Sequence, residues 1–158
     1  MPDQADDLER VAHLLADAAR EAILPLFRSP SLDAANKDAE GGGEPGTEAD
    51  RAAERAMRDI LAVERPEDAI HGEEYGFSPG TSGFTWVLDP IDGTRAFICG
   101  TPTWGVLIAV NAGGPPVVGL VDQPHDGERY EGTPGGAYLE HRGTTRSLAT
   151  RNRPLADA

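Results

Sequence analysis

The stretch that most constrains the fold is residues 86–94, in which an apolar run leads into two closely spaced aspartates. Val87 and Leu88 are typical of the end of a buried strand. Pro90 fixes one backbone φ angle and has no N–H for a ladder hydrogen bond, so we expect the strand to stop there. Gly93 then allows the backbone to come close to a ligand. The pattern predicts a strand that ends in a stiff turn carrying carboxylates.

The two aspartates of this turn, Asp89 and Asp92, suit a hard cation. Mg²⁺ prefers oxygen ligands and keeps waters that a substrate can displace. If a helix begins at Gly93 or Thr94, its free N–H groups favour a phosphate. Cation ligands and an anion site would then lie side by side, as metal-assisted hydrolysis of a phosphate ester requires. An Asp-Pro turn followed by an Asp-Gly turn is the alternative without a site.

The charge of the chain limits its partners. Its 158 residues include 27 acidic and 14 basic ones, for a formal charge of −13. This balance argues against nucleic acid and against an anionic membrane surface, whereas a small phosphate can bind where metal ions supply positive charge. No apolar run is long enough to span a bilayer. Cys99 is the single cysteine, which excludes an intrachain disulfide, and we expect a cytoplasmic protein.

Two stretches near the N-terminus, residues 6–27 and 47–63, have apolar residues at helical spacing. Pro25 should kink or shorten the last turn of the first. Thr47 and Asp50 resemble a capping box at the start of the second. The segment between the two helices has little apolar material and several glycines, which is typical of a flexible connector.

The rest of the chain reads mainly as strands. After a short helix over residues 95–100, apolar runs at residues 106–110 and 117–121 and shorter stretches at residues 128–131 and 137–139 read as strands separated by turns. Strands at this regular spacing indicate an antiparallel meander. Two helices followed by strands indicate an α+β fold, with two N-terminal helices packed on a largely antiparallel sheet. The length is that of one domain.

Two motifs resemble those of a known family. Residues 89–94, Asp-Pro-Ile-Asp-Gly-Thr, resemble the signature of the inositol-monophosphatase-like family of Mg²⁺-dependent phosphatases. Gly72-Glu73-Glu74 resembles the second motif of that family, although by itself it could be a solvated acidic turn. The resemblance implies four Mg²⁺ ligands, namely Glu73, Asp89, the carbonyl of Ile91 and Asp92.

The same resemblance implies direct attack of water on the phosphate, without a covalent intermediate. One metal would lower the pKa of a bound water, and another would stabilise the leaving oxygen. Asp50 and Thr94 would be catalytic, because they orient and deprotonate the water. Phosphate would be bound by Glu73 and by the N–H groups of Gly93 and Thr94. Lys37 would match a lysine on a mobile loop that helps to organise an additional metal.

The residues after Thr94 point to one branch of the family. Arg95-Ala96-Phe97, followed by Gly100, Pro102 and Trp104-Gly105, resembles the histidinol-phosphate phosphatase branch of histidine biosynthesis more than the inositol branch. The expected substrate is a small phosphomonoester, L-histidinol phosphate first and inositol monophosphate second. A nucleotide or fructose bisphosphate fits this signature less well.

The family also has a second, C-terminal α/β domain, which supplies another aspartate to the metals. Nothing in residues 1–158 matches it, so we expect residues 1–158 to be the N-terminal phosphatase domain, with the C-terminal domain absent. The alternative is a truncated remnant that binds Mg²⁺ without turnover. In either case a sheet face would be left exposed, which favours association, for example as a homodimer.

Overall fold

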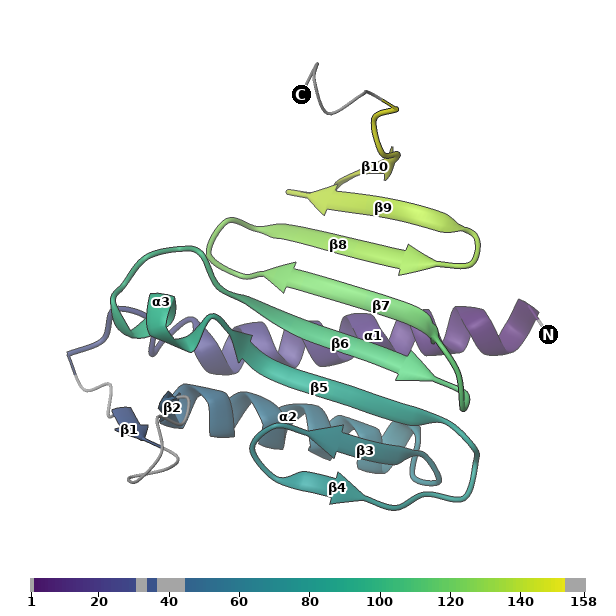
Figure 1. Ribbon diagram of the computed structural model, residues 1–158, viewed down its shortest axis with the longest axis horizontal. Coiled ribbons are helices and arrows are strands. Elements are labelled where there is room, and N and C mark those ends of the chain that lie inside the picture. The colour runs from purple at the N-terminus through teal and green to yellow at the C-terminus, as the bar shows by residue number, and fades with distance from the viewer. Residues whose placement is uncertain (1, 31–33, 37–44, 153–158) are drawn as a thin grey trace.

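The computed structural model describes residues 2–30, 34–36 and 45–152 (Figure 1). The helices in these ranges are α1 (Pro2–Ile23), α2 (Glu48–Glu64) and the short α3 (Thr94–Ile98). The strands are β1 (Ala34–Asn36), β2 (Pro45–Thr47), β3 (Ala69–Gly72), β4 (Gly76–Ser78), β5 (Thr85–Asp92), β6 (Gly105–Asn111), β7 (Pro116–Gln123), β8 (Glu128–Thr133), β9 (Gly136–His141) and β10 (Thr144–Leu148). No helix in these ranges is both long and apolar enough to cross a bilayer.

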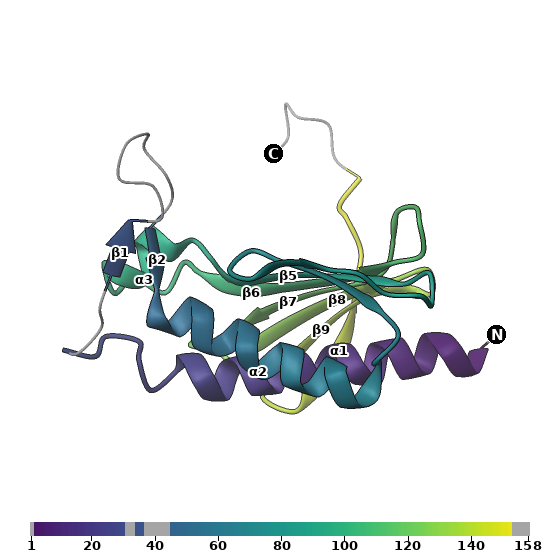
Figure 2. The ribbon, with the colours of Figure 1, turned by 90° about the horizontal axis from the view of Figure 1, so that it is seen from below.

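Eight strands form one sheet in the order β10-β9-β8-β7-β6-β5-β3-β4 (Figure 1). Neighbouring strands are antiparallel except β3 and β5, which are parallel. Helices α1 and α2 lie side by side against one face of this sheet (Figure 2), α1 across β6 and β7 and α2 across β5. The predicted α+β architecture, with two N-terminal helices on a largely antiparallel sheet, is confirmed.

The core lies between the helices and the strands. In α1 the buried residues recur at helical spacing, and in the strands buried residues alternate with more exposed ones, as the two side-chain periods require. The buried set includes Leu8, Val11, Leu15 and Ile23 from α1, Met57 and Leu61 from α2, and Trp86, Leu88, Val106, Ile108, Val110, Val118 and Leu120 from the strands. The alternate strand residues face the side of the sheet without helices.

Substitutions on the two faces of the sheet should lower the free energy of unfolding by different amounts. Leu120→Ala removes a side chain that is only 2% exposed and packs in the core. We expect it to lower the free energy of unfolding by about 2–5 kcal/mol. Leu107→Ala, on the open face of the neighbouring strand β6, should cost only about 1 kcal/mol, because less area is removed from water there. Urea denaturation of both variants measures the difference, and equal losses would contradict this assignment of faces.

The first helix is shorter at its C-terminal end than the apolar spacing predicts. Residues 6–27 were expected, whereas α1 ends at Ile23. Pro25 has no N–H to continue the helix, and its ring disfavours a helical conformation at Leu24. The predicted shortening by Pro25 is therefore confirmed, and the chain continues in turns in which Leu26 and Phe27 donate to the carbonyl of Ile23.

The prediction that a strand stops at Pro90 is wrong. β5 continues to Asp92, and its pairing with β6 shifts register between Asp89 and Asp92. Such a bulge leaves a residue outside the hydrogen-bonded ladder, so a proline without an N–H is tolerated there. The strand therefore carries both aspartates.

The segment between α1 and α2 is more regular than the predicted connector. Three residues of β1 pair with β2 in an antiparallel register, with Ala34 opposite Thr47. The strands β4 and β10 also had no counterpart in the sequence prediction. Lys37, the predicted loop lysine, lies outside the described residues.

Candidate active site

Glu73 and Asp89 follow two neighbouring strands to the same sheet edge. β3 and β5 are parallel, with Gly72 opposite Leu88. Parallel strands have their carboxyl ends at the same edge of the sheet. Glu73 directly follows Gly72, and Asp89 directly follows Leu88, so Glu73 and Asp89 lie beside each other. The Glu73 N–H donates to the Leu88 carbonyl over 3.1 Å, which ties the two chain segments together. A cleft of about 270 Å³ opens here, lined by His71, Gly72, Glu73, Val87, Leu88 and Asp89.

Asp89 lies among carboxylates that act on its protonation. Burial, a hydrogen bond and charge repulsion from Glu73, and the charges of Asp92 and Asp50 together raise the pKa of the Asp89 carboxyl to about 7. Asp89 Oδ1 is buried and has no hydrogen-bond partner within the part of the chain that the structure describes. Crowded carboxylates of this kind are stabilised by a proton or by a bound cation. The predicted ligands Glu73, Asp89 and Asp92 thus influence one another across this edge.

The turn from β5 into α3 has a demanding geometry. The Ile91 side chain is 1% exposed and anchors the turn in the core. Gly93 has a φ of +87°, and a Cβ there would lie 2.9 Å from the Thr103 carbonyl oxygen. Both the backbone conformation and the close approach therefore require glycine. The Thr94 hydroxyl donates to the Ile91 carbonyl over 3.0 Å, closing the turn.

The start of α2 presents Asp50 to Thr94. Thr47 is the N-cap, and Asp50 Oδ2 accepts from both its N–H, at 2.7 Å, and its hydroxyl, so the predicted capping box is confirmed. The other carboxylate oxygen, Asp50 Oδ1, lies 3.5 Å from Thr94 Oγ1. Asp50 is 0% exposed and Thr94 6% exposed. The capping role and the proposed catalytic role use different oxygens of one carboxylate, so they are compatible.

The donor atoms at this edge fit Mg²⁺ in their chemistry. In the described ranges, no three or more His, Cys, Asp or Glu side chains are already arranged as a site that could hold a metal ion. However, the carboxylates of Glu73, Asp89 and Asp92 and the carbonyl of Ile91 are all hard oxygen donors, the type that Mg²⁺ prefers. A carbonyl has a second lone pair besides the one that Thr94 uses. Within the Asp89 carboxylate, Oδ1 is buried without a hydrogen-bond partner among the described residues, and a bound cation would satisfy it.

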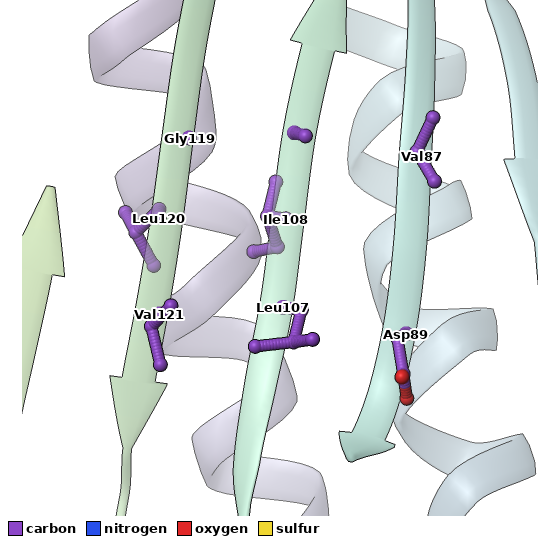
Figure 3. Close-up of a pocket in the computed structure, with 8 residues that line it drawn as sticks. Val87, Asp89, Leu107, Ile108, Gly119, Leu120 and Val121 are labelled. Carbon is purple, nitrogen blue, oxygen red and sulfur yellow. The ribbon is translucent and has the colours of Figure 1, made fainter. Parts of the chain in front are cut away.

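An apolar hollow adjoins the carboxylates on the open face of the sheet (Figure 3). It has a volume of about 450 Å³, and its lining comes from β5, β6 and β7. In Figure 3 the helices lie behind the strands, and Val87, Leu107 and Val121 line the side away from them. Val87 and Val121 are each 38% exposed. Asp89 lies at one end of the hollow, so the apolar face and the carboxylate edge are continuous.

Three other polar residues lie in simpler surroundings. Arg95, which follows the motif of residues 89–94, is exposed on α3. His71 is exposed, and its ring lies edge-on to Phe77 with centroids 6.4 Å apart. His13 lies between Glu131 and Arg129, with its ring nitrogens 3.2 and 3.0 Å from them. His13 therefore takes part in a polar network away from the candidate site.

Sequence reasoning missed a charged pair on α2. Glu54 is 0% exposed, and Arg58 Nε donates to it over 2.8 Å. The signal that could have revealed this pair is a carboxylate on the apolar face of the helix, between the buried Ala53 and Met57. A buried charge is costly unless it is paired, so its presence there needs a reason.

Comparison with known proteins settles the family. A model described as "Inositol monophosphatase family" matches residues 4–156. The chain belongs to the inositol monophosphatase family. A histidinol-phosphatase of Streptomyces coelicolor is 46% identical over 134 residues, which cover 82% of this chain and 48% of that protein. The family resemblance inferred from the two motifs is thereby confirmed.

Solved structures support the same family and the same fold. The extragenic suppressor protein suhB from Bartonella henselae superposes with a TM-score of 0.83 at 26% identity, covering 92% of this chain and 55% of that one. An inositol monophosphatase from Zymomonas mobilis gives a TM-score of 0.73 at 42% identity, covering 94% of this chain and 55% of that one. The chain thus spans about half the length of the family members that it matches.

Proposed function

We propose that residues 1–158 form the N-terminal, metal-binding domain of a Mg²⁺-dependent phosphomonoesterase whose substrate is L-histidinol phosphate. The observation that carries this proposal is the meeting of Glu73, Asp89 and Asp92 with the Asp50–Thr94 pair at one sheet edge. These residues come from the turn directly after β3, from β5, from α2 and from α3, which are separate in sequence. Family membership supports a phosphatase reaction.

The metal-binding part of the proposal uses oxygen atoms only. Glu73, Asp89, the Ile91 carbonyl and Asp92 would hold Mg²⁺. When bound, Mg²⁺ would supply a Lewis acid that lowers the pKa of a water and offsets negative charge on the leaving oxygen. It would also take the place of the proton that Asp89 otherwise holds below about pH 7.

Thr94 and Asp50 would handle the proton of the attacking water. The Thr94 hydroxyl has one hydrogen, which it donates to Ile91 O at 3.0 Å or directs to Asp50 Oδ1 at 3.5 Å. When the hydrogen points to Asp50, a lone pair of Thr94 Oγ1 is free to accept from water. Asp50 then serves as the final acceptor, while its other oxygen stays fixed by Thr47.

The phosphate would lie against the backbone between β5 and α3. The positive φ of Gly93 turns the chain there, and the absent side chain lets a ligand come close to the amides of Gly93 and Thr94. Those N–H groups would bind phosphate oxygens. Glu73 would act on the same phosphate through the cation that it binds. The acidic chain would therefore rely on Mg²⁺ to attract its anionic substrate.

The preference for histidinol phosphate rests on two supports. Arg95-Ala96-Phe97 follows the motif, and a histidinol-phosphatase is 46% identical over 134 residues. Inositol monophosphate is the second candidate, because a 42% identical structure is of an inositol monophosphatase. In either case the partner is a small phosphorylated molecule, in keeping with the expected cytoplasmic location.

Phosphate release by the purified 158-residue chain tests the proposal. L-histidinol phosphate and inositol 1-phosphate are compared, each with Mg²⁺ and with EDTA. We expect Mg²⁺-dependent release with the higher kcat/KM for histidinol phosphate, and a preference for inositol 1-phosphate would favour the second candidate. Mg²⁺ binding without release would mean that the chain is a remnant or needs the half that its relatives have. A chain that neither binds Mg²⁺ nor releases phosphate would contradict the proposal.

A further inference from the structure

We propose that Glu54 is a positioning residue that fixes the location of Glu73 by holding the backbone of the turn after β3. This inference rests on the proposed function, in which Glu73 binds Mg²⁺. Glu54 itself would not touch the metal or the substrate. Its effect would pass through the peptide groups that follow Glu73.

The contacts of Glu54 are directed at that turn. Glu54 is 0% exposed, and its Oε2 accepts from the Glu74 N–H over 2.6 Å. Its Oε1 accepts from the Tyr75 N–H over 3.2 Å. A carboxylate that accepts backbone N–H groups makes short, charge-assisted hydrogen bonds. The two amides immediately after Glu73 are therefore bound to a buried, rigidly held anion.

Arg58, one helical turn after Glu54 on α2, binds both Glu54 and the chain that follows the turn. Its Nε donates to Glu54 over 2.8 Å, which balances the buried charge. Its other nitrogens donate to the Gly76 carbonyl over 2.6 Å and to the Ser78 hydroxyl over 2.9 Å. Glu54 and Arg58 thus bind the turn between β3 and β4 and the strand that follows it, from Glu74 to Ser78. A purely apolar contact between helix and turn would leave the amides of Glu74 and Tyr75 without acceptors, at a cost in free energy of about 1–3 kcal/mol each.

Gly72 shows that the fold makes room for the carboxylate. Gly72 is buried, and a Cβ at this position would lie 1.8 Å from Glu54 Oε1. No positive φ requires glycine here, so the requirement comes from the Glu54 side chain. The residue directly before Glu73 is small because the carboxylate passes beneath it.

One face of α2 would then serve both parts of the site. Asp50 and Glu54 are four residues apart, so they lie on the same side of the helix. Asp50 reaches Thr94, whereas Glu54 reaches the turn that carries Glu73. A single rigid element would set the distance between the proton acceptor and a metal ligand. Fixing ligands from behind in this way commonly changes metal affinity about 10–100-fold.

The test is Glu54→Gln, which keeps the shape but replaces one acceptor oxygen with an amide NH2 group, which can only donate. At least one of the donors at Glu74, Tyr75 and Arg58 then faces another N–H. We expect the Kd for Mg²⁺, measured by titration calorimetry, to rise about 10–100-fold. We also expect the amides of Glu74 and Tyr75 to exchange faster with solvent in the metal-free chain, as followed by NMR.

Asp68→Asn is the matched control for simple destabilisation. Asp68 is also buried and also pairs with an arginine, since Arg65 Nε donates to it over 2.8 Å and Trp86 Nε1 donates over 2.8 Å. It precedes β3, at the end of the strand away from Glu73. We expect this variant to lose stability in thermal unfolding while its Kd for Mg²⁺ stays within about twofold of the unaltered chain, since it leaves the ligands and their supports in place.

Several results would overturn the inference. Unchanged Mg²⁺ affinity or unchanged amide exchange in Glu54→Gln would do so, as would an equal loss of affinity in Asp68→Asn. If Glu54→Gln does not fold, Gly72→Ala decides, because the added methyl would overlap the Glu54 carboxylate, push it away from the turn and should weaken Mg²⁺ binding in the same way. Absence of Mg²⁺ binding in the unaltered chain would instead contradict the proposed function, and this inference with it.

Discussion

Asp92→Asn is expected to remove Mg²⁺ binding while leaving the fold intact. The substitution deletes the charge of one proposed ligand but changes the side-chain volume little. Asp92 is exposed at the end of β5, so it contributes little to the core. We expect the Kd for Mg²⁺ to rise at least about 100-fold, because the loss of a ligand should exceed the loss of a supporting contact. Calorimetric titration measures the affinity, and circular dichroism checks the fold.

Asp126→Asn is the matched control for this loss of charge. Asp126 is likewise an exposed aspartate, but it lies in the turn between β7 and β8. With a formal charge of −13, the chain attracts cations in general, so both variants weaken that attraction equally. Only Asp92→Asn should abolish Mg²⁺-dependent phosphate release, in any form of the protein that shows it. Full Mg²⁺ affinity in Asp92→Asn would remove Asp92 from the metal site.

The part of the site between Asp89 and Thr94 could be predicted because it is contiguous. The six consecutive residues 89–94 carry two carboxylates, a carbonyl, a glycine and a hydroxyl, so the local pattern contains most of the chemistry. The positive φ of Gly93 agrees with the expected close approach of the backbone. Glu73 is different, because its place beside Asp89 depends on the parallel pairing of β3 with β5. Periodicity does not reveal such pairing, and only the family motif pointed to Glu73.

The errors in the fold prediction have local physical causes. Pro90 was expected to stop a strand because it cannot donate to a ladder, but a bulge exempts that position from donating. β1 and β4 comprise three residues each, too few for a periodic signal. The apolar face of α1 was predicted well, since its side chains repeat over more than five turns of helix.

The role of Glu54 could not be predicted from sequence, although its unusual position on the apolar face of α2 could be noticed. A charged residue on the apolar side of α2 conflicts with the pattern of an amphipathic helix. The conflict is resolved only by the tertiary structure, where Glu74 and Tyr75 donate their amides to it. Conflicts between local pattern and position are expected at functional sites, which is why this residue supports a proposal.

Asp50→Asn is expected to separate turnover from metal binding. In the proposed mechanism Asp50 accepts the proton of the attacking water but is not a ligand. Loss of this acceptor should lower kcat about 10²–10⁴-fold, the usual contribution of a general base. The Kd for Mg²⁺ should change far less than in Asp92→Asn, because the four proposed ligands remain. Steady-state kinetics and calorimetry on one preparation give both quantities.

Glu48→Gln controls for the helix-capping role of Asp50. Both acids lie in the first turn of α2, where negative charge stabilises the helix, but Glu48 is exposed and pairs with Arg51 and Arg55 on the surface. Each substitution should lower stability by about 0.5–1 kcal/mol. If slow turnover followed from a frayed helix, Glu48→Gln would be slow as well. Near-normal kcat in Glu48→Gln beside a large loss in Asp50→Asn would identify Asp50 as the base, because only its Oδ1 lies 3.5 Å from the Thr94 hydroxyl.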